Sequence, residues 1–298
     1  MKILLLGKRG QVGWELQRSL APLGEIVALS SGSQNYCGDF TNLQGLADTV
    51  RRVKPDIIVN AAAHTAVDKA ESEPELARII NADAVAVLAR EAKSLGAWLI
   101  HYSTDYVFDG SGVKPWSEVD VTGPLGIYGA TKLAGEQAIQ DSGCKHLIFR
   151  TSWVYGARGN NFAKTMLRLA AERDSLTVID DQVGAPTGAD LLADVTAHTI
   201  RSVQNTPALG GLYHLVAAGE TTWHGYASFV IDFARKNGQQ LKTIPESIAL
   251  VPSSAFPTPA QRPKNSRLDT RKLQTNFNLT LPQWQAGVAR MLTEFLEK

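Results

Sequence analysis

The first half of the chain alternates short apolar runs with longer amphipathic segments, and this alternation restricts the fold more than any other feature. The apolar runs occupy residues 2–7, 25–30, 56–62 and 98–104, and segments with helical periodicity lie between them over 13–24, 42–55 and 75–96. Strands that are apolar on both faces and alternate with helices form a parallel sheet covered by helices on both sides. The sequence therefore predicts the α/β class, with a Rossmann-type doubly wound parallel sheet.

The alternation weakens after Val154, where loops become more frequent. Residues 180–188 are rich in turn formers, and residues 251–269 contain four prolines. A linker would have a similar composition, but an amphipathic segment over 281–298 follows and predicts a closing helix. We therefore expect a dinucleotide-binding domain over 1–154, to which later parts of the chain return. Residues 155–298 should form mainly a smaller C-terminal α/β substrate domain, whose loops cover a ligand.

Charge and composition exclude several classes of protein. The formal net charge is +1, so bulk electrostatics favour neither nucleic acid nor a membrane surface as a partner. The apolar start is too short for a signal peptide, and no later run could span a bilayer. Cys37 and Cys144 offer no disulfide framework, which suits the cytoplasm. The six histidines lack the spacing of metal ligands, and we expect them at the surface or half-buried.

Three glycines lie between the first predicted strand and the first predicted helix, at the spacing GxxGxxG. This spacing is a variant of the dinucleotide-binding fingerprint, in which glycines let the backbone approach a pyrophosphate at a helix N-terminus. We expect the phosphates to lie against Gly7, Gly10, Gln11, Val12 and Gly13.

The second predicted strand ends in Ser30 and Ser31, without the carboxylate that NAD-specific sites place on the ribose 2′-hydroxyl. Lys8 and Arg9 lie inside the glycine turn, where a cation could meet the 2′-phosphate of NADPH. These features favour NADPH or at least permit it, so the expected cofactor is NADPH or NADH. Solvated loop charges are the alternative interpretation of Lys8 and Arg9.

Tyr128 and Lys132 lie four residues apart in the helix that follows the strand over 98–104. Residues at this spacing share one face of a helix, so the two side chains can point at a common spot. The same spacing is frequent in helices without a function, and the surrounding motifs give the pair its meaning.

Those motifs follow one another along essentially the whole chain: GQVG, DF at 39–40, PDIIVNAAAHTAVDKAE at 55–71, INADA, STDYVFDG, YGATKLAGE, RTSWVYG, DDQVGAPT and RPKNSRLD. With them the sequence resembles the extended short-chain dehydrogenase/reductase superfamily, and within it the dTDP-4-dehydrorhamnose reductase family. The resemblance implies NAD(P)H-dependent reduction of the 4-keto group of dTDP-4-dehydro-L-rhamnose to dTDP-L-rhamnose. A homodimer is compatible with it. Acidic residues such as Glu15 could bind Mg²⁺, but the sequence contains no metal-ligand constellation.

The resemblance also implies roles for individual residues. Tyr128 would donate a proton to the developing alkoxide, Lys132 would lower the pKa of Tyr128 and hold the nicotinamide ribose, and Thr104 would orient the carbonyl. Further cofactor contacts are expected from Asp39, Phe40, Ala63, His64, Thr65 and Tyr102. The substrate is expected to contact Thr104, Asp105, Trp153, Gln182, Arg262 and Ser266.

Two other functions fit the same motifs. One is another sugar-nucleotide enzyme on this scaffold, an epimerase or a 4,6-dehydratase. The other is a non-catalytic regulatory subunit, which would have no use for a proton donor beside the nicotinamide. Fold alone does not separate these functions.

Overall fold

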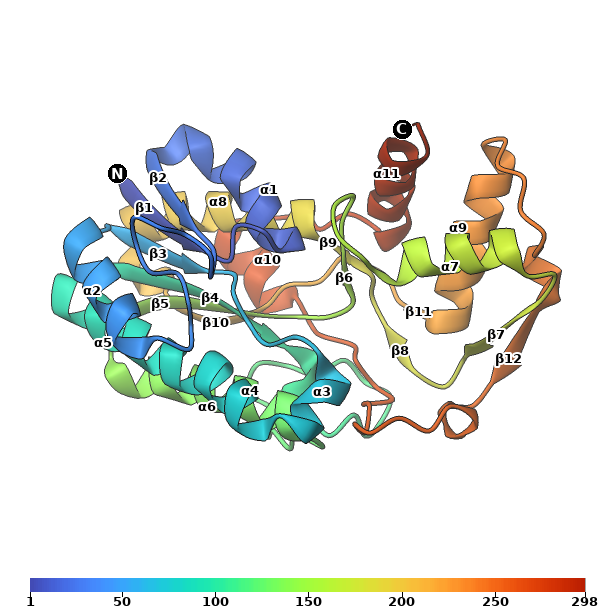
Figure 1. Cartoon of the computed structure of the whole chain (residues 1–298), viewed down its shortest axis with the longest axis horizontal. Coiled ribbons are helices and arrows are strands. Elements are labelled where there is room, and N and C mark those ends of the chain that lie inside the picture. The colour runs from blue at the N-terminus through green and yellow to red at the C-terminus, as the bar shows by residue number, and fades with distance from the viewer. Residues whose placement is uncertain (298) are drawn as a thin grey trace.

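A six-stranded parallel sheet forms the centre of the computed structural model, which describes residues 1–297. The strands lie in the order β10-β5-β4-β3-β1-β2 (Figure 1). Their bounds are Lys2–Leu6 (β1), Glu25–Leu29 (β2), Ile57–Asn60 (β3), Trp98–Thr104 (β4), Lys145–Thr151 (β5) and Gly211–His214 (β10). The predicted α/β class with a parallel sheet is confirmed.

Helices cover both faces of this sheet, because successive strand residues are buried on opposite sides. Ile3 and Leu5 pack in one core and Leu4 and Leu6 in the other. The first core includes residues of α1 (Gln11–Leu20), α8 (Ala189–Asn205) and α10 (Arg271–Phe277). The second includes residues of α2 (Leu43–Val53), α5 (Ala84–Leu95) and α6 (Ile127–Ser142), on the other side of the sheet in Figure 1.

The helix predicted over 75–96 is interrupted by a π-helical turn. It consists of α4 (Pro74–Arg78), the π turn Ile79–Asp83 and α5, and it follows the short α3 (Val67–Ser72). The π turn contains the buried Asn81, whose amide donates to the backbone oxygen of His64 and to the hydroxyl of Thr131 in α6. A π turn inside a helix often accompanies a functional site. Here it ties the loop after β3 to the helix that carries Tyr128.

A second unit with its own core lies to the right in Figure 1. Its helices are α7 (Phe162–Glu172), α9 (Trp223–Lys236) and α11 (Trp284–Leu296), and the last matches the predicted closing helix. Three strand pairs accompany them: β7 (Leu176–Ile179) with β12 (Ile248–Val251), β8 (Val183–Gly184) with β11 (Thr221–Thr222), and β6 (Val154–Tyr155) with β9 (Thr187–Gly188). Short 3-10 turns occupy Ala21–Leu23, Asp105–Val107, Pro207–Leu209, Pro245–Ser247 and Ser253–Ala255.

The chain crosses between the two units several times after Val154. Helix α8, strand β10 and helix α10 pack in the sheet unit, whereas α7, α9 and α11 pack in the core of the second unit. Within residues 1–297, no helix combines the length and hydropathy needed to cross a membrane.

Candidate active site

The sheet reverses its direction of growth at β1, which has β2 on one side and β3 on the other. In open α/β sheets, ligands bind at such a point, outside the carboxyl ends of the strands. Gly7 directly follows β1 with φ at +89°, and a Cβ there would lie 2.6 Å from the backbone carbon of Ala61. The turn after β1 thus touches the segment after β3, and only glycine permits that contact.

The N-terminus of α1 fits a dinucleotide phosphate. The N-cap is Gly10, which has no side chain to cap the helix. The N–H groups of Gln11 and Val12 have no hydrogen-bond partner among residues 1–297. A Cβ on Gly13 would lie 2.1 Å from the oxygen of Gly7, so packing requires that glycine. A Cβ on Gly10 would meet no atom closer than 3.5 Å. Packing leaves the space at Gly10 free, and free N–H groups face a site suited to an anion.

Thr104, Tyr128 and Lys132 come together at the end of β4. Thr104 is the last residue of β4, and Tyr128 and Lys132 lie one turn apart in α6. A Cβ on Gly129 would lie 2.1 Å from the backbone oxygen of Tyr106, so this glycine lets α6 begin against the loop after β4. The Thr104 hydroxyl donates to Asp105 Oδ1 at 3.1 Å and also hydrogen-bonds Tyr128.

Lys132 is almost completely buried, with 2% of its surface exposed. Its Nζ donates to the backbone oxygen of Tyr102 at 2.6 Å and lies 3.2 Å from His101 Nε2. Burial lowers the pKa of Lys132 to about 8, while the negative charge of Glu136 acts in the opposite direction. Glu136 itself pairs with the buried Arg150 at 2.6 Å.

The phenol of Tyr128 has a pKa raised to about 12, because burial outweighs the hydrogen bond with Thr104. The lowering expected from Lys132 is absent in the protein alone. Lys132 Nζ is bonded to the Tyr102 oxygen, and burial disfavours its charge. A high pKa keeps the proton on Tyr128 at neutral pH, as a proton donor requires.

Asp105 provides a buried carboxylate beside this group. It is 2% exposed, and its Oδ2 has no hydrogen-bond partner among residues 1–297. Burial raises its pKa to about 6, although the nearby Ser266 side chain and the hydrogen bond from Thr104 favour the charged form. The Ser266 N–H donates to the Val183 oxygen, which holds the loop of Ser266 against β8.

Two stacked tryptophans, Trp153 and Trp223, lie beside Gln182, the residue before β8. Gln182 Oε1 accepts from Trp223 Nε1 at 3.0 Å, and the ring of Trp223 stacks on Trp153 with centroids 3.7 Å apart. Trp153 has φ at +50°, which a non-glycine residue rarely adopts. Strain of this kind is often found at functional sites.

Arg262 is already paired in this structure. Its Nη2 lies 2.8 Å from Asp68 Oδ2 in α3, and it also contacts Tyr106. The ion pair joins the proline-rich loop to the sheet unit, and about a quarter of the Arg262 side chain is exposed.

The other expected cofactor residues lie in the segments after β2 and β3 and on β4. Asp39 Oδ1 accepts from the N–H and hydroxyl of Thr41, and Phe40 is buried in the second core. Ala63, His64 and the exposed Thr65 follow β3. The Tyr102 hydroxyl bonds Thr196 of α8 at 2.6 Å, so its side chain is held toward that helix.

Known proteins match this chain over its full length. The family model described as RmlD substrate binding domain matches residues 1–297. A dTDP-4-dehydrorhamnose reductase of Salmonella typhimurium is 65% identical, over 99% of this chain and 98% of its own length. The chain belongs to the dTDP-4-dehydrorhamnose reductase family. The family expected from the sequence motifs is confirmed.

Solved structures of the reductase family have the same architecture. The crystal structure from Clostridium acetobutylicum superposes with a TM-score of 0.89 at 33% identity and covers 100% of both chains. That from Bacillus anthracis, in complex with NADP, has a TM-score of 0.86 at 34% identity and covers 100% of this chain and 99% of its own.

Sequence reasoning missed two buried residues of this site, Asn60 and His101. His101 was expected at the surface or half-buried, but it is completely buried, as is His214 on β10. The expectation was wrong because His101 lies on the central strand β4, and His214 on the edge strand β10 is covered by Phe108 and by the loop of Trp116. The available signal was a polar residue near the carboxyl end of an otherwise apolar strand, as in IIVN and WLIHYST.

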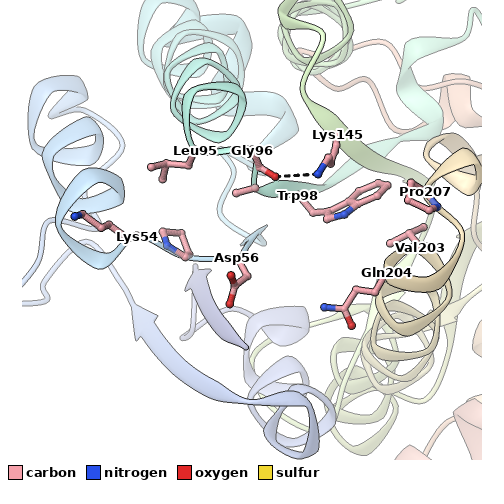
Figure 2. A pocket seen from close by; sticks show the side chains of 11 residues that line it. Lys54, Asp56, Leu95, Gly96, Trp98, Lys145, Val203, Gln204 and Pro207 are labelled. Carbon is pink, nitrogen blue, oxygen red and sulfur yellow. Dashed lines mark hydrogen bonds between the residues drawn. The ribbon is translucent and has the colours of Figure 1, made fainter.

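A cavity lies outside this site. It has a volume of about 460 Å³ and opens at the amino ends of β3, β4 and β5, where Figure 2 shows Lys54, Asp56 and Trp98 around it. Lys145 Nζ donates there to the Gly96 oxygen at 3.2 Å. No group of three or more potential metal ligands occurs within residues 1–297, and Glu15 pairs with Arg18.

Proposed function

We propose that this protein reduces the 4-keto group of dTDP-4-dehydro-L-rhamnose to give dTDP-L-rhamnose, with NADPH or NADH as cofactor. One observation carries the proposal: the buried Thr104 and Lys132 and the half-buried Tyr128 lie together at the carboxyl ends of the strands of the sheet whose first turn fits a dinucleotide phosphate. Membership of the reductase family supports the substrate.

The chemistry divides between cofactor and chain. The bound nicotinamide supplies a hydride to C4 of the sugar. Thr104 orients the carbonyl oxygen with its hydroxyl, and Tyr128 donates the proton that this oxygen needs as it becomes a hydroxyl. Lys132 holds the ribose, and in its charged form it stabilises the phenolate left on Tyr128.

Asp105, Trp153, Gln182, Arg262 and Ser266 bind the substrate in this proposal. The unpartnered Asp105 Oδ2 accepts from a sugar hydroxyl, and the ring of Trp153, whose backbone has a positive φ, forms a wall for the hexose. Arg262 binds the diphosphate in a bidentate fork, exchanging Asp68 for phosphate oxygens.

The residue after Asp105 argues against a dehydratase. Dehydratases of this superfamily have Asp and then Glu after the catalytic Thr, and this carboxyl pair eliminates water. Here the second position is Tyr106, whose pKa is raised further by burial, so it is a poor acid/base for elimination. A regulatory subunit is disfavoured because such a protein has no use for a proton-donating Tyr–Lys pair beside the nicotinamide.

We also propose that the protein acts in the cytoplasm and that it can form a homodimer. Cys37 and Cys144 are both free thiols, which is compatible with a reducing compartment.

Loss of NADPH absorbance on addition of dTDP-4-dehydrorhamnose tests the activity. We expect turnover with the wild type and none with Lys132→Met. Equal rates for both proteins would contradict the proposed site, and absence of turnover in the wild type would contradict the function.

A further inference from the structure

A chain of buried polar side chains leads from β3 to Lys132. Asn60 ends β3, and His101 is its direct partner on β4. Asn60 is 1% exposed and His101 is fully buried. Asn60 Nδ2 lies 3.0 Å from His101 Nδ1, and His101 Nε2 lies 3.2 Å from Lys132 Nζ. Buried polar groups need hydrogen-bond partners, so each contact constrains where the protons lie.

The backbone fixes the orientation of the Asn60 amide. Its Oδ1 accepts the N–H of Ala62 at 3.0 Å. The donor end, Nδ2, therefore faces His101, and Nδ1 of the ring accepts. A neutral imidazole carries one proton, so that proton lies on Nε2. Burial, and then the charge of Lys132, lower the pKa of His101 well below its ordinary value, so the ring is neutral near pH 7.

The Nε2–H of His101 consequently points at Lys132 Nζ. A neutral amine has a lone pair that accepts this hydrogen, whereas an ammonium has only donors. The bond from Nζ to the Tyr102 oxygen exists for either form. The contact with His101 therefore disfavours the ammonium, in the same direction as burial.

The other charged or titratable groups around Lys132 do not replace this contact. Glu136 on α6 favours the ammonium, but Arg150 of β5 neutralises it at 2.6 Å. Tyr128 is uncharged at neutral pH, and Asp105 beyond it bonds Thr104.

We propose that Asn60 and His101 are positioning residues: Asn60 selects the His101 tautomer, and this tautomer lets Lys132 gain and lose its proton close to neutral pH. The inference rests on the proposed reduction, in which Lys132 must be charged beside Tyr128. Activity should then fall at mildly alkaline pH as Lys132 loses its charge. A changed His101 tautomer should shift the pH at which this fall occurs.

Nitrogen NMR of ¹⁵N-histidine-labelled protein tests the tautomer without cofactor or turnover. We expect the His101 ring to carry its proton on Nε2 and to stay neutral at pH values well below the ordinary pKa of histidine. A proton on Nδ1, or a ring that titrates near its ordinary pKa of about 6.5, would overturn the proposal. This result does not depend on the substrate, so it is distinguishable from failure of the proposed function.

Asn60→Asp reverses the tautomer by design. With Oδ1 still on the Ala62 N–H, a second oxygen faces His101, so Nδ1 must carry the proton and the Nε2 lone pair faces Lys132. The ammonium is then favoured, and the alkaline limb of the kcat/KM profile should move upward by about one pH unit or more.

His101→Gln provides a second variant, because its amide can turn an oxygen toward Lys132 and should also move the limb upward. The control is His214→Gln, which alters a buried histidine of the same sheet that contacts the Trp116 oxygen. It should reduce stability and leave the limb in place. A limb that stays fixed in both test variants, or moves equally in the control, would overturn the proposal.

Discussion

At the scale of single residues, the site depends on proton positions that burial sets. Tyr128 has a pKa of about 12 and Lys132 one of about 8, and both shifts come chiefly from loss of water. The phenol therefore holds its proton at neutral pH, while the lysine lies close to its own titration. This combination suits a proton donor for a ketone reduction.

Tyr128→Phe should lower kcat by about 10²–10⁴-fold, because general acid catalysis typically contributes that much. The ring remains, so the affinity for NADPH should change little. Stopped-flow turnover and cofactor fluorescence titration measure the two quantities. Tyr213→Phe is the control, since Tyr213 lies on the remote strand β10 and its hydroxyl donates to the Leu209 oxygen. A Tyr128→Phe protein with near-normal kcat would rule out the assigned role.

Asp105→Asn should raise the free energy of unfolding at pH 8. Burial raises the Asp105 pKa from 3.8 to about 6. At pH values above 6 the carboxyl is charged in both states, and the charge destabilises the native state relative to the unfolded chain. The gain is up to about 3 kcal/mol at pH 8, declines between pH 6 and pH 4, and vanishes below, where the carboxyl is protonated in both states. Urea unfolding at pH 8 and pH 4 measures it. A variant equally destabilised at both pH values would contradict this account.

At the scale of elements, the glycines in the turn between β1 and α1 have two different roles, packing and ligand binding. Gly13 is needed by the fold, since a Cβ there would lie 2.1 Å from the Gly7 oxygen, whereas the space beside Gly10 is open. The GxxGxxG spacing predicted the turn, but it did not show which glycine serves which purpose. That distinction depends on how β1 and α1 meet in three dimensions.

Gly10→Ala should fold with a stability change below about 1 kcal/mol, because its backbone already suits alanine. Its methyl group should weaken NADPH binding at least about tenfold by filling the phosphate site. Gly13→Ala should instead lose about 1–3 kcal/mol of stability through overpacking. Thermal unfolding and cofactor titration compare them, and unchanged affinity in Gly10→Ala would show that the phosphate lies elsewhere.

Ser31→Asp should raise the KM for NADPH more than that for NADH. Ser31 is exposed in the loop after β2, where a carboxylate would repel the 2′-phosphate. Asn35→Asp is a matched control, as it adds the same charge at another exposed position of this loop. If both variants keep the wild-type ratio of KM values, the 2′-phosphate does not lie beside Ser31.

At the scale of the whole molecule, two units are joined by a chain that crosses between them. The sheet and the Tyr128–Lys132 helix were predictable because strand and helix periodicities are local. The buried Asn60–His101 contact was not, since it depends on the register of β3 and β4. Likewise, the GLYH segment becomes the sixth strand only because β5 offers it an edge. The stacking of Trp153 on Trp223 also joins residues far apart in sequence.

The most direct test of the central claim follows deuterium from C4 of labelled NADPH during incubation with dTDP-4-dehydrorhamnose. The account predicts one NADPH oxidised per substrate consumed, deuterium at C4 of the dTDP-L-rhamnose formed, and no reaction with dTDP-glucose. Mass spectrometry and proton NMR of the products show whether deuterium is present at C4 and whether dTDP-glucose has reacted. Conversion of dTDP-glucose to a product lighter by one water, without added cofactor, would show a dehydratase and contradict the account.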